Sequence, residues 1–438
     1  MKFKSYEIQM LGVLCILTLL AAMNSVIFNV AMPAISIDLS ISPAMASWIS
    51  VGYTSIIAIG ALTYGKLSES YSVRKLLIYG VLLFSLGSSI GFIGYKSYFI
   101  ILVGRGIQAS GGASFVTLAM VAINQYIPTK MQGNALAFIS IAIALALGIG
   151  PLLGGIITTY LGWRYLFVFM LGSMGLIIFL LKLFPNEKER AVKEPIDYLG
   201  GFLIFLVIIL FLLGVNVSSP LLVLAVLTYS ILLSWERKRT YPFIKVKLLK
   251  NNSFVSLICI GFVINACHLA TLFILPLLFA NHYQLGPNIV GSVFFLACIF
   301  SVLSSIVTRK KLTKENSTLI FYLAVASLLM GFSGLLLLWN VSFMAICFSF
   351  IFIAIGYSPI QIVLNMLVPT TLDKNDIGTG LGLYNVLNFV GMAFGPALMS
   401  KLLTDSTHYS FGFGLCILMT LGNVYLISIF KKKQKGSV

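Results

Sequence analysis

The sequence has little charge, and acidic residues are the scarcer sign. Only 9% of its 438 residues are charged, and 12 are Asp or Glu, whereas a soluble domain carries about 25% charged residues. This composition excludes an ordinary soluble domain. Apolar runs of about 20 residues recur along the whole chain, each long enough to cross a hydrocarbon layer of roughly 30 Å as a helix. The sequence therefore predicts an all-α polytopic membrane protein.

Patterns of catalytic and metal sites are also lacking. There is no G-x-x-x-x-G-K-S/T loop, no H-E-x-x-H and no pair of acids inside an apolar run. The six cysteines form no CxxC or metal-ligand spacing, so we interpret them as small apolar residues: Cys15, Cys259, Cys267, Cys298, Cys347 and Cys416. We therefore expect neither an enzyme nor a bound cofactor.

Fourteen apolar spans are predicted. They cover about residues 9–32, 46–64, 76–95, 98–124, 134–158, 164–184, 199–216, 220–235, 253–280, 288–308, 317–338, 341–369, 377–400 and 409–430. We divide the chain into a six-helix N-terminal half, a central region with inner loops and two additional helices, a six-helix C-terminal half and a basic tail: residues 1–184, 185–252, 253–430 and 431–438. The two central spans have almost no polar side chains and are expected to be peripheral and lipid-facing.

Lys and Arg gather on one side of this topology. With the N-terminus inside, 25 of the 29 fall in inner loops and tails, and only Lys96, Arg164 and Lys401 lie at the outer edge. This distribution follows the positive-inside rule, so both termini are expected in the cytoplasm. The net charge of +17 thus reports membrane topology, and no nucleic-acid partner is expected.

The two halves repeat a Gly-Pro motif at the same position within each group. The residues concerned are Gly148, Gly150, Pro151, Gly154 and Gly155 in the fifth span, and Gly395 and Pro396 in the thirteenth. Gly-Pro inside a membrane helix bends it and lets neighbouring helices approach closely. Matching kinked helices in two six-helix halves predict a repeat-built transporter whose halves rock about a site near the midplane.

One charge lies inside a span. Arg105 is about seven residues into the fourth span, where an arginine costs about 2.5–3.5 kcal/mol on insertion scales, so we expect it to face a cavity or a partner. The alternative is that its side chain reaches the outer interface. Gln108, one turn further on, could share its hydrogen bonds.

No acid lies in the middle of a span, so a proton or substrate that binds there would need other residues. His268 is the only one of three histidines inside a span and could carry a proton; alternatively it is a neutral packing residue. Candidate cavity residues are Asn24, Tyr53, Asn265, Gln361, Asn365, Tyr384, Asn385 and Asn388, with Gln108. Amides and aromatics suit a neutral or zwitterionic amphiphile, or a chelate, better than a strong cation. Alternatively, each hydrogen-bonds between helices.

A charged hairpin joins the second and third spans. It carries Gly65, Leu67, Glu69, Arg74 and Lys75. We interpret it as a gate at the inner mouth, where Glu69 and Arg74 make charged contacts in one access state and lose them in the other. The alternative is a tight turn that only satisfies the positive-inside rule.

Together these motifs resemble the major facilitator superfamily, in particular its fourteen-helix drug:proton antiporters and the Gram-positive tetracycline efflux proteins. The hairpin resembles the signature G-x-L-a-D-r-x-G-r-k, with Glu69 in place of Asp and Ser72 in place of the second Gly. Further matches are Arg105–Gln108 with Gly111–Ala113, Gly148–Gly155, Asn29–Pro33, Trp48–Tyr53 and Tyr241–Ile244.

The resemblance implies a bacterial plasma-membrane exporter of amphiphilic drugs, tetracycline-like or multidrug, that works by alternating access. It also implies energy from the proton gradient, a proton-coupling role for Arg105 and a monomer in the bilayer. Related tetracycline exporters carry acids in helices one, five and thirteen, where this chain has Asn24-Ser25, Leu147 and Met392. An exporter or facilitator of an endogenous metabolite, lipid or peptide, with weak or no proton coupling, is therefore the alternative.

Overall fold

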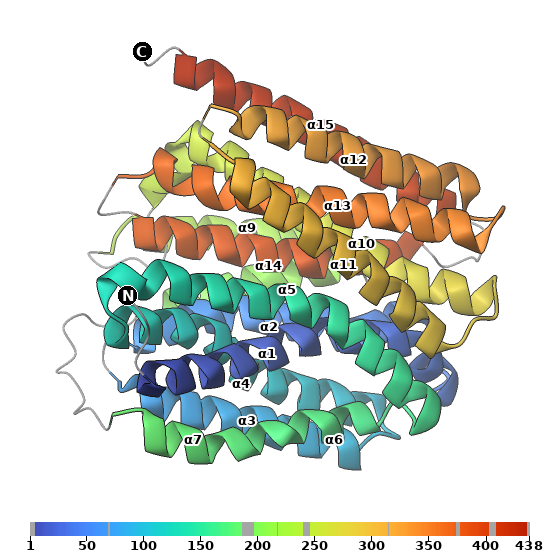
Figure 1. The fold of residues 1–438 in the computed structure, drawn as a ribbon, viewed down its shortest axis with the longest axis horizontal. Helices are drawn as coiled ribbons and strands as arrows, with labels where there is room; N and C mark the ends of the chain where they lie inside the picture. The colour runs from blue at the N-terminus through green and yellow to red at the C-terminus, as the bar shows by residue number, and fades with distance from the viewer. Residues whose placement is uncertain are drawn as a thin grey trace.

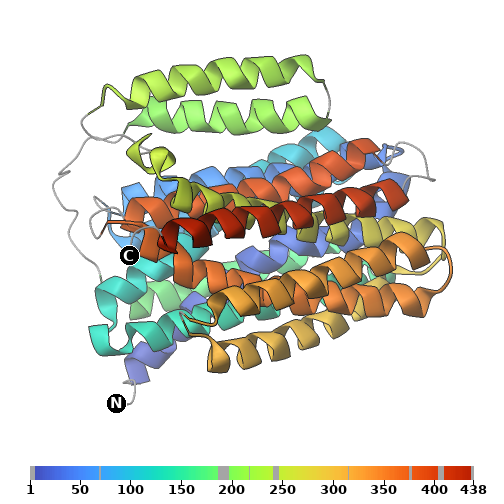
Figure 2. The same ribbon diagram turned by 90° about the horizontal axis from the view of Figure 1, so that it is seen from above.

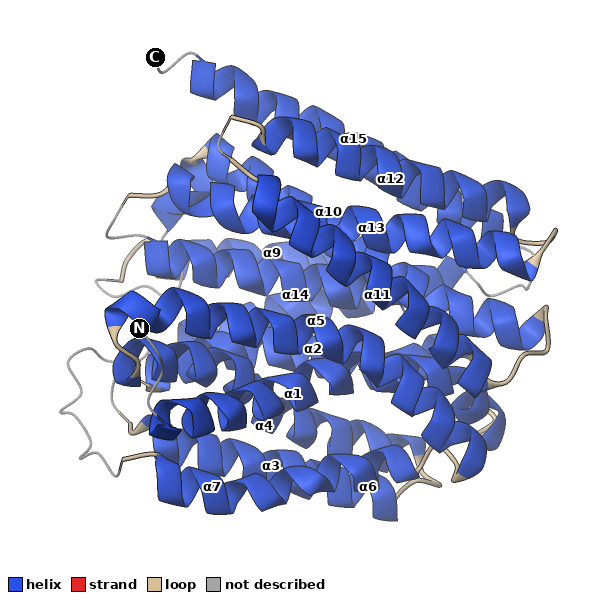
Figure 3. Cartoon of the chain, in the orientation of Figure 1, coloured by secondary structure: helices blue, strands red, loops and turns tan. Residues whose placement is uncertain are grey.

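The computed structural model describes residues 5–68, 71–185, 197–216, 218–239, 246–313, 315–373, 377–402 and 409–435. Helices joined by short turns make up these residues, and no strand occurs among them (Figure 3). The N-terminal helices are α1 Ser5–Asp38, α2 Pro43–Leu67, α3 Val73–Ile93, α4 Tyr98–Tyr126, α5 Thr129–Tyr160, α6 Tyr165–Leu171, η1 Gly172–Gly175 and α7 Leu176–Leu183. The remainder are α8 Tyr198–Asn216, α9 Pro220–Glu236, η2 Val246–Lys250, α10 Asn252–Asn281, α11 Pro287–Lys311, α12 Ser317–Leu338, α13 Phe343–Leu367, η3 Val368–Thr371, α14 Ile377–Leu402 and α15 Tyr409–Lys435.

Twelve of the described helices are long and apolar enough to cross a membrane, and one of these combines α6, η1 and α7 as residues Tyr165–Leu183. The two shorter apolar helices, Leu199–Val215 and Pro220–Glu236, correspond to the two central spans. The predicted all-helical polytopic class is confirmed. The first helix extends beyond its predicted end, because α1 continues through Pro33 to Asp38. A proline is tolerated within a long membrane helix when neighbouring groups satisfy the freed backbone.

The helices repeat with an almost constant register. The helices α2 and α11 begin at Pro43 and Pro287, and α3 and α12 begin at Val73 and Ser317. The number of residues between the two starts is the same for both pairs. The separation is one residue longer between the starts of α4 and α13, and also between the prolines within α5 and α14. This register is the pattern expected of an internal repeat, and it makes α1, α2, α4 and α5 the equivalents of α10, α11, α13 and α14.

The helices form one bundle in which α1 begins and α15 ends at the same end (Figure 1). We call it the basic end, because described basic residues such as Arg74, Lys182 and Arg309 lie at the helix ends there, and we call the opposite end the far end. Three main helix pairs join the halves: α5 with α11, α2 with α14, and α1 with α10. Large apolar side chains cover the outer surface of the bundle, such as Leu323 and Met330 on α12 and Leu418 on α15. This is the surface that lipid covers in a membrane protein.

The α8–α9 hairpin lies against one side of the bundle (Figure 2). Ile204, Ile208 and Leu212 of α8 pack in one apolar cluster with Val51 of α2 and Val386 of α14. The helix α9 packs on α8 and turns a row of apolar side chains outward. The expected peripheral position is therefore found, and α8 covers the line along which α2 of one half meets α14 of the other.

Candidate functional site

Arg105 of α4 is buried in the N-terminal half, with 1% of its surface exposed. Its Nε donates to the carbonyl oxygen of Ile49, 2.9 Å away. One terminal nitrogen donates to Asn24 Oδ1 at 3.0 Å and to Gln108 Oε1 at 2.7 Å, and the other donates to the Asn24 carbonyl oxygen at 3.2 Å. Arg105 thus faces protein partners, including the expected Gln108. The alternative in which it reaches the outer interface is wrong for this state.

Two aromatic rings complete the surroundings of the guanidinium. Its central carbon lies 4.3 Å from the ring centre of Phe28 and 4.1 Å from that of Tyr53. A cation over a ring face in a desolvated site gains about 2 kcal/mol. Gln108 continues the network by donating to Ser88 Oγ of α3 at 2.7 Å. The arginine cluster, as we call it, ties α1, α2, α3 and α4 together. Its members are Asn24, Phe28, Tyr53, Ser88, Arg105 and Gln108.

The C-terminal half holds a second polar cluster on α10, α13 and α14. The Tyr357 hydroxyl donates to Asn265 Oδ1 at 2.8 Å, and Asn265 Nδ2 donates to Asn388 Oδ1 at 3.2 Å. The Tyr384 hydroxyl donates to Gln361 Oε1 at 3.3 Å. With His268, these residues form what we call the histidine cluster. Four of the predicted cavity residues thus come together: Asn265, Gln361, Tyr384 and Asn388.

The His268 ring stacks on Tyr357, with ring centres 3.9 Å apart and an angle of 12° between planes. The side chain is 8% exposed, and its Nδ1 has no hydrogen-bond partner among the described residues. Sequence reasoning missed Tyr357. The available signal was its position four residues before Gln361, which is the same spacing as between Tyr384 and Asn388.

The predicted cavity residues do not all share these clusters. Asn24 and Tyr53 are buried against Arg105, whereas Asn365 and Asn385 are exposed. The helix α2, which carries Tyr53, packs on α14, which carries Asn388, where the two halves meet. Phe389 of α14, next to Asn388, packs against the apolar group that contains Tyr53. Neighbouring residues of α14 therefore contribute to the histidine cluster, through Asn388, and to the packing around the Tyr53 group, through Phe389.

The glycines of α5 serve two different faces of that helix. Gly148 and Gly155, seven residues apart, face α11 of the other half, where an added Cβ would meet the Cys298 side chain and the backbone of Pro287 and Asn288. Gly150 and Gly154, four residues apart, face α1, against Met23 and Ile27. Residues three, four or seven apart lie on one face of a helix, so the spacing alone assigns each pair of glycines to its own face of α5. The helix is continuous through Pro151, and its bend stays a prediction.

The equivalent helix α14 has the second of these faces, on which Gly391 and Gly395 lie against the backbone of α10. A Cβ added at Gly395 would meet the Ala266 carbonyl of α10, as one at Gly150 would meet α1. At the position equivalent to Gly155, α14 has Ser400, whose Oγ accepts a hydrogen bond from Ser47 Oγ of α2 at 3.2 Å. The helix also runs unbroken through Pro396. The halves therefore meet by close backbone packing at α5–α11 and by apolar and hydroxyl contacts at α2–α14.

A family model of the Major Facilitator Superfamily matches residues 14–396. The chain belongs to this superfamily. It is 24% identical over 409 residues, 91% of each chain, to YvkA, an uncharacterized MFS-type transporter of Bacillus subtilis (strain 168). It is 25% identical over 336 residues to Multidrug resistance protein 3 of the same organism, covering 74% of this chain and 64% of that protein.

Among solved structures, a POT family transporter in complex with 5-aminolevulinic acid has a TM-score of 0.72 at 14% identity. The match covers 97% of this chain and 96% of that chain. Because the family model covers most of the chain, this major facilitator protein is a transporter and not an enzyme, as the sequence predicted. Its likeness to the fourteen-helix branch and to tetracycline exporters stays a prediction, and the central-loop match at Tyr241–Ile244 lies outside the described residues.

The hairpin that matches the superfamily signature lies at the basic end. Arg74 Nη1 donates to the Phe184 carbonyl oxygen at 3.2 Å, at the C-terminal end of α7. A cation at this position satisfies a free helix-end carbonyl and suits the helix dipole. Gly65 and Leu67 end α2, and Lys75 lies in the first turn of α3. Glu69 lies outside the described residues, so the proposed Glu69–Arg74 gate stays a prediction.

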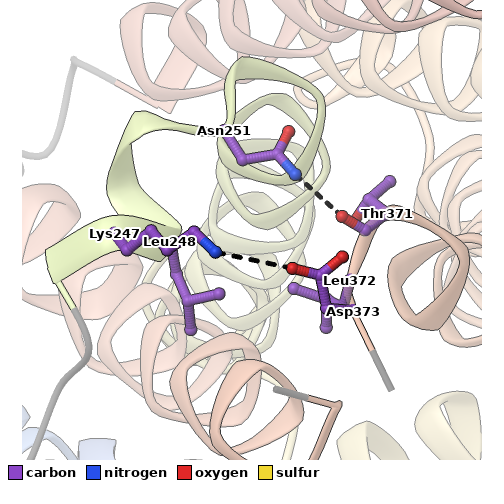
Figure 4. Close-up of a pocket in the computed structure, with 6 residues that line it drawn as sticks. All are labelled: Lys247, Leu248, Asn251, Thr371, Leu372 and Asp373. Carbon is purple, nitrogen blue, oxygen red and sulfur yellow. Dashed lines mark hydrogen bonds and ion pairs between the residues drawn. The ribbon is translucent and has the colours of Figure 1, made fainter. Parts of the chain in front are cut away.

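A small pocket of about 70 Å³ lies at the basic end of this transporter's C-terminal half (Figure 4). Asn251 Nδ2 donates to the Thr371 carbonyl at 2.7 Å, and Lys247 Nζ lies 3.6 Å from Asp373 Oδ2. Both charged side chains are about four-fifths exposed, at 80% and 78%, so this ion pair adds little stability. Ligand sites typically have volumes of roughly 300 Å³ or more, so this pocket is too small for one. Its contacts tie η2 and the start of α10 to the end of η3.

Proposed function

We propose that this transporter exports amphiphilic drugs, tetracycline-like or broader, from the cytoplasm in exchange for protons. The observation that carries the proposal is the pair of buried polar clusters, one in each half, on helices that include α2 and α14, which pack together where the halves meet. An alternating-access site is expected near the midplane between the two repeats. The similarity to a protein named for multidrug resistance supports the same class of substrate. In this proposal, the protein works as a monomer in the bacterial cell membrane, with both termini in the cytoplasm.

The proton-binding role falls to His268 in this proposal. It is the only histidine inside a described span, and its Nδ1 is left without a described partner. In this state the ring is shielded from water by its stack with Tyr357. The proton would enter in a state that opens this part of α10 to water. Arg105 and Gln108 then serve as the charged network that changes when the halves move.

An export screen in a host without its own drug pumps tests this proposal. Cells that express the chain are expected to accumulate less of at least one amphiphilic compound, with tetracyclines included in the panel. A protonophore is expected to restore accumulation to the level of cells without the chain. Equal accumulation of every compound with and without the chain would contradict drug export.

Replacing His268 by glutamine is expected to remove the dependence of export on the pH gradient. Glutamine keeps a polar side chain of similar reach, but it cannot carry a proton. The measurement is drug accumulation in everted vesicles with and without an imposed pH gradient. His282, which lies after α10 at the far end and contacts the Trp339 ring, offers a matched control. Its replacement by glutamine is expected to leave gradient dependence unchanged. Unaltered gradient dependence in His268→Gln would contradict the assigned role.

A second candidate function is an exporter or facilitator of an endogenous compound with weak or no proton coupling. The observation that favours it is the lack of any Asp or Glu in the middle of a predicted span. Proton flux on substrate addition separates the candidates. Proton exchange accompanies each transported molecule in the first and is absent in the second.

A further inference from the structure

The arginine cluster contains a full positive charge with no acidic partner among the described residues. Every hydrogen bond that Arg105 donates there ends on a neutral oxygen, from Ile49, Asn24 or Gln108. On α1, Asp38 lies about four turns beyond Asn24, and Glu7 lies almost five turns before it. At a rise of about 1.5 Å per residue, these acids are about 21 Å and about 25 Å away along the helix. Asp38 also accepts a hydrogen bond from Trp163 Nε1 at 2.7 Å.

This charge lies close to the place where the halves meet. The Tyr53 ring lies 4.1 Å from the guanidinium carbon, and Phe389 of the other half packs against the apolar group to which Tyr53 belongs. Because α2 packs on α14 and packed helix axes are about 8–10 Å apart, a molecule that passes between the halves at this level would come within roughly 10 Å of the charge. The charge therefore acts on a passing substrate without touching it.

We infer that this transporter selects organic anions, an inference that rests on the proposed export function and specifies its substrate class. At about 10 Å and an effective dielectric constant of about 20, a unit charge changes the affinity for a singly charged ligand by about 15-fold. An anion gains this factor and a cation loses it, so the two differ by roughly 200-fold. The amides that could offset the charge, Asn24 and Gln108, already direct their oxygens at the guanidinium.

The inference also predicts the electrical character of transport. Export of an anion and entry of a proton each move net positive charge into the cell. A membrane potential that is negative inside the cell therefore drives the exchange even without a pH gradient. Exchange of a monovalent cation for one proton would be electrically silent.

Three fluorescent or radiolabelled probes test this selection in everted vesicles that contain the full chain. They are 8-anilinonaphthalene-1-sulfonate, its neutral analogue N-phenyl-1-naphthylamine, and the cation tetraphenylphosphonium. The anion is expected to accumulate at least about 10-fold above the neutral analogue, and the cation no more than in vesicles without the chain. A lumen-positive potential, set with potassium and valinomycin, is expected to increase the chain-dependent uptake of the anion.

Two variants of Asn24 test whether Arg105 is the cause. Asn24→Asp places a carboxylate about 3.0 Å from the guanidinium nitrogen and neutralises it in place, with almost no change in shape. The anion-to-neutral ratio is expected to fall at least about 10-fold. Asn24→Ala adds no charge and is expected to keep that ratio, whatever its effect on the rate.

Three outcomes would overturn the inference or the function beneath it. Uptake of the neutral or cationic probe at or above that of the anion overturns anion selection while export stands. An unchanged ratio in Asn24→Asp overturns the assignment to Arg105. Chain-dependent movement of none of the probes contradicts the export function itself.

Discussion

Replacing Arg105 by alanine is expected to reduce gradient-driven transport at least about 100-fold, which corresponds to about 2.7 kcal/mol of lost stabilisation. The variant removes four hydrogen bonds, three that join α4 to α1 and α2 and one to Gln108 within α4. It also removes the cation between Phe28 and Tyr53. Each buried polar group left without its partner costs about 1–3 kcal/mol. The contacts between α1, α2 and α4 then no longer have a defined geometry, although both access states depend on them.

The measurement is initial uptake into everted vesicles, with the amount of folded protein determined by size-exclusion chromatography in detergent. Arg164 provides a matched control, because it is partly exposed at the far end and also lies against two rings, Tyr95 and Tyr165, each at 5.0 Å. Arg164→Ala is expected to transport normally. Arg105→Lys keeps the charge but not the forked geometry, so an intermediate loss is expected. Undiminished transport by Arg105→Ala would exclude any role for the arginine cluster.

Replacing Gly155 by valine is expected to lower transport more than 10-fold by separating the halves at the far end. A Cβ at this position would overlap the Pro287 carbonyl oxygen and lie 3.0 Å from Asn288 Cα. Both are backbone atoms, so no side-chain rotation relieves the overlap. Overpacking typically costs about 1–3 kcal/mol in a closed structure, which favours states in which α5 and α11 are apart.

A cysteine introduced at Thr159 reports this opening, because Thr159 Oγ1 accepts a hydrogen bond from the Asn288 backbone N–H at 3.2 Å. Its labelling by a membrane-impermeant maleimide from the far side is expected to be faster in the valine variant. Gly414 of α15 offers a matched control, since nothing lies within 4 Å of a Cβ added there. Gly414→Val is expected to change neither labelling nor transport. Normal transport by Gly155→Val would show that the halves do not need this close contact.

The helices and some local contacts could be predicted from the sequence, because both depend on residues near one another in the chain. Apolar runs of sufficient length determine the spans, and a spacing of three residues on one helix places Gln108 within reach of Arg105. The far end of α1 was predicted too early. A proline normally marks a helix end, but Pro33 lies within α1 and the helix continues to Asp38.

Contacts between distant segments could not be predicted in the same way. The pairing of Asn24 with Arg105 and the stack of His268 on Tyr357 depend on how whole helices rotate and slide against each other. The glycines of α5 show the same division. Their spacing separates Gly148 and Gly155 from Gly150 and Gly154, but only the packed structure shows that the first pair faces α11 and the second faces α1.

Proton movement on substrate addition is the most direct test of proton-driven export. Everted vesicles containing the full chain carry a pH-sensitive dye in the lumen, with the lumen acidified in advance. Addition of a transported compound identified by the export screen is expected to make the lumen more alkaline at a rate proportional to substrate uptake, and His268→Gln is expected to remove this response. Substrate uptake at the normal rate with no change in lumenal pH would contradict proton exchange and favour the uncoupled facilitator.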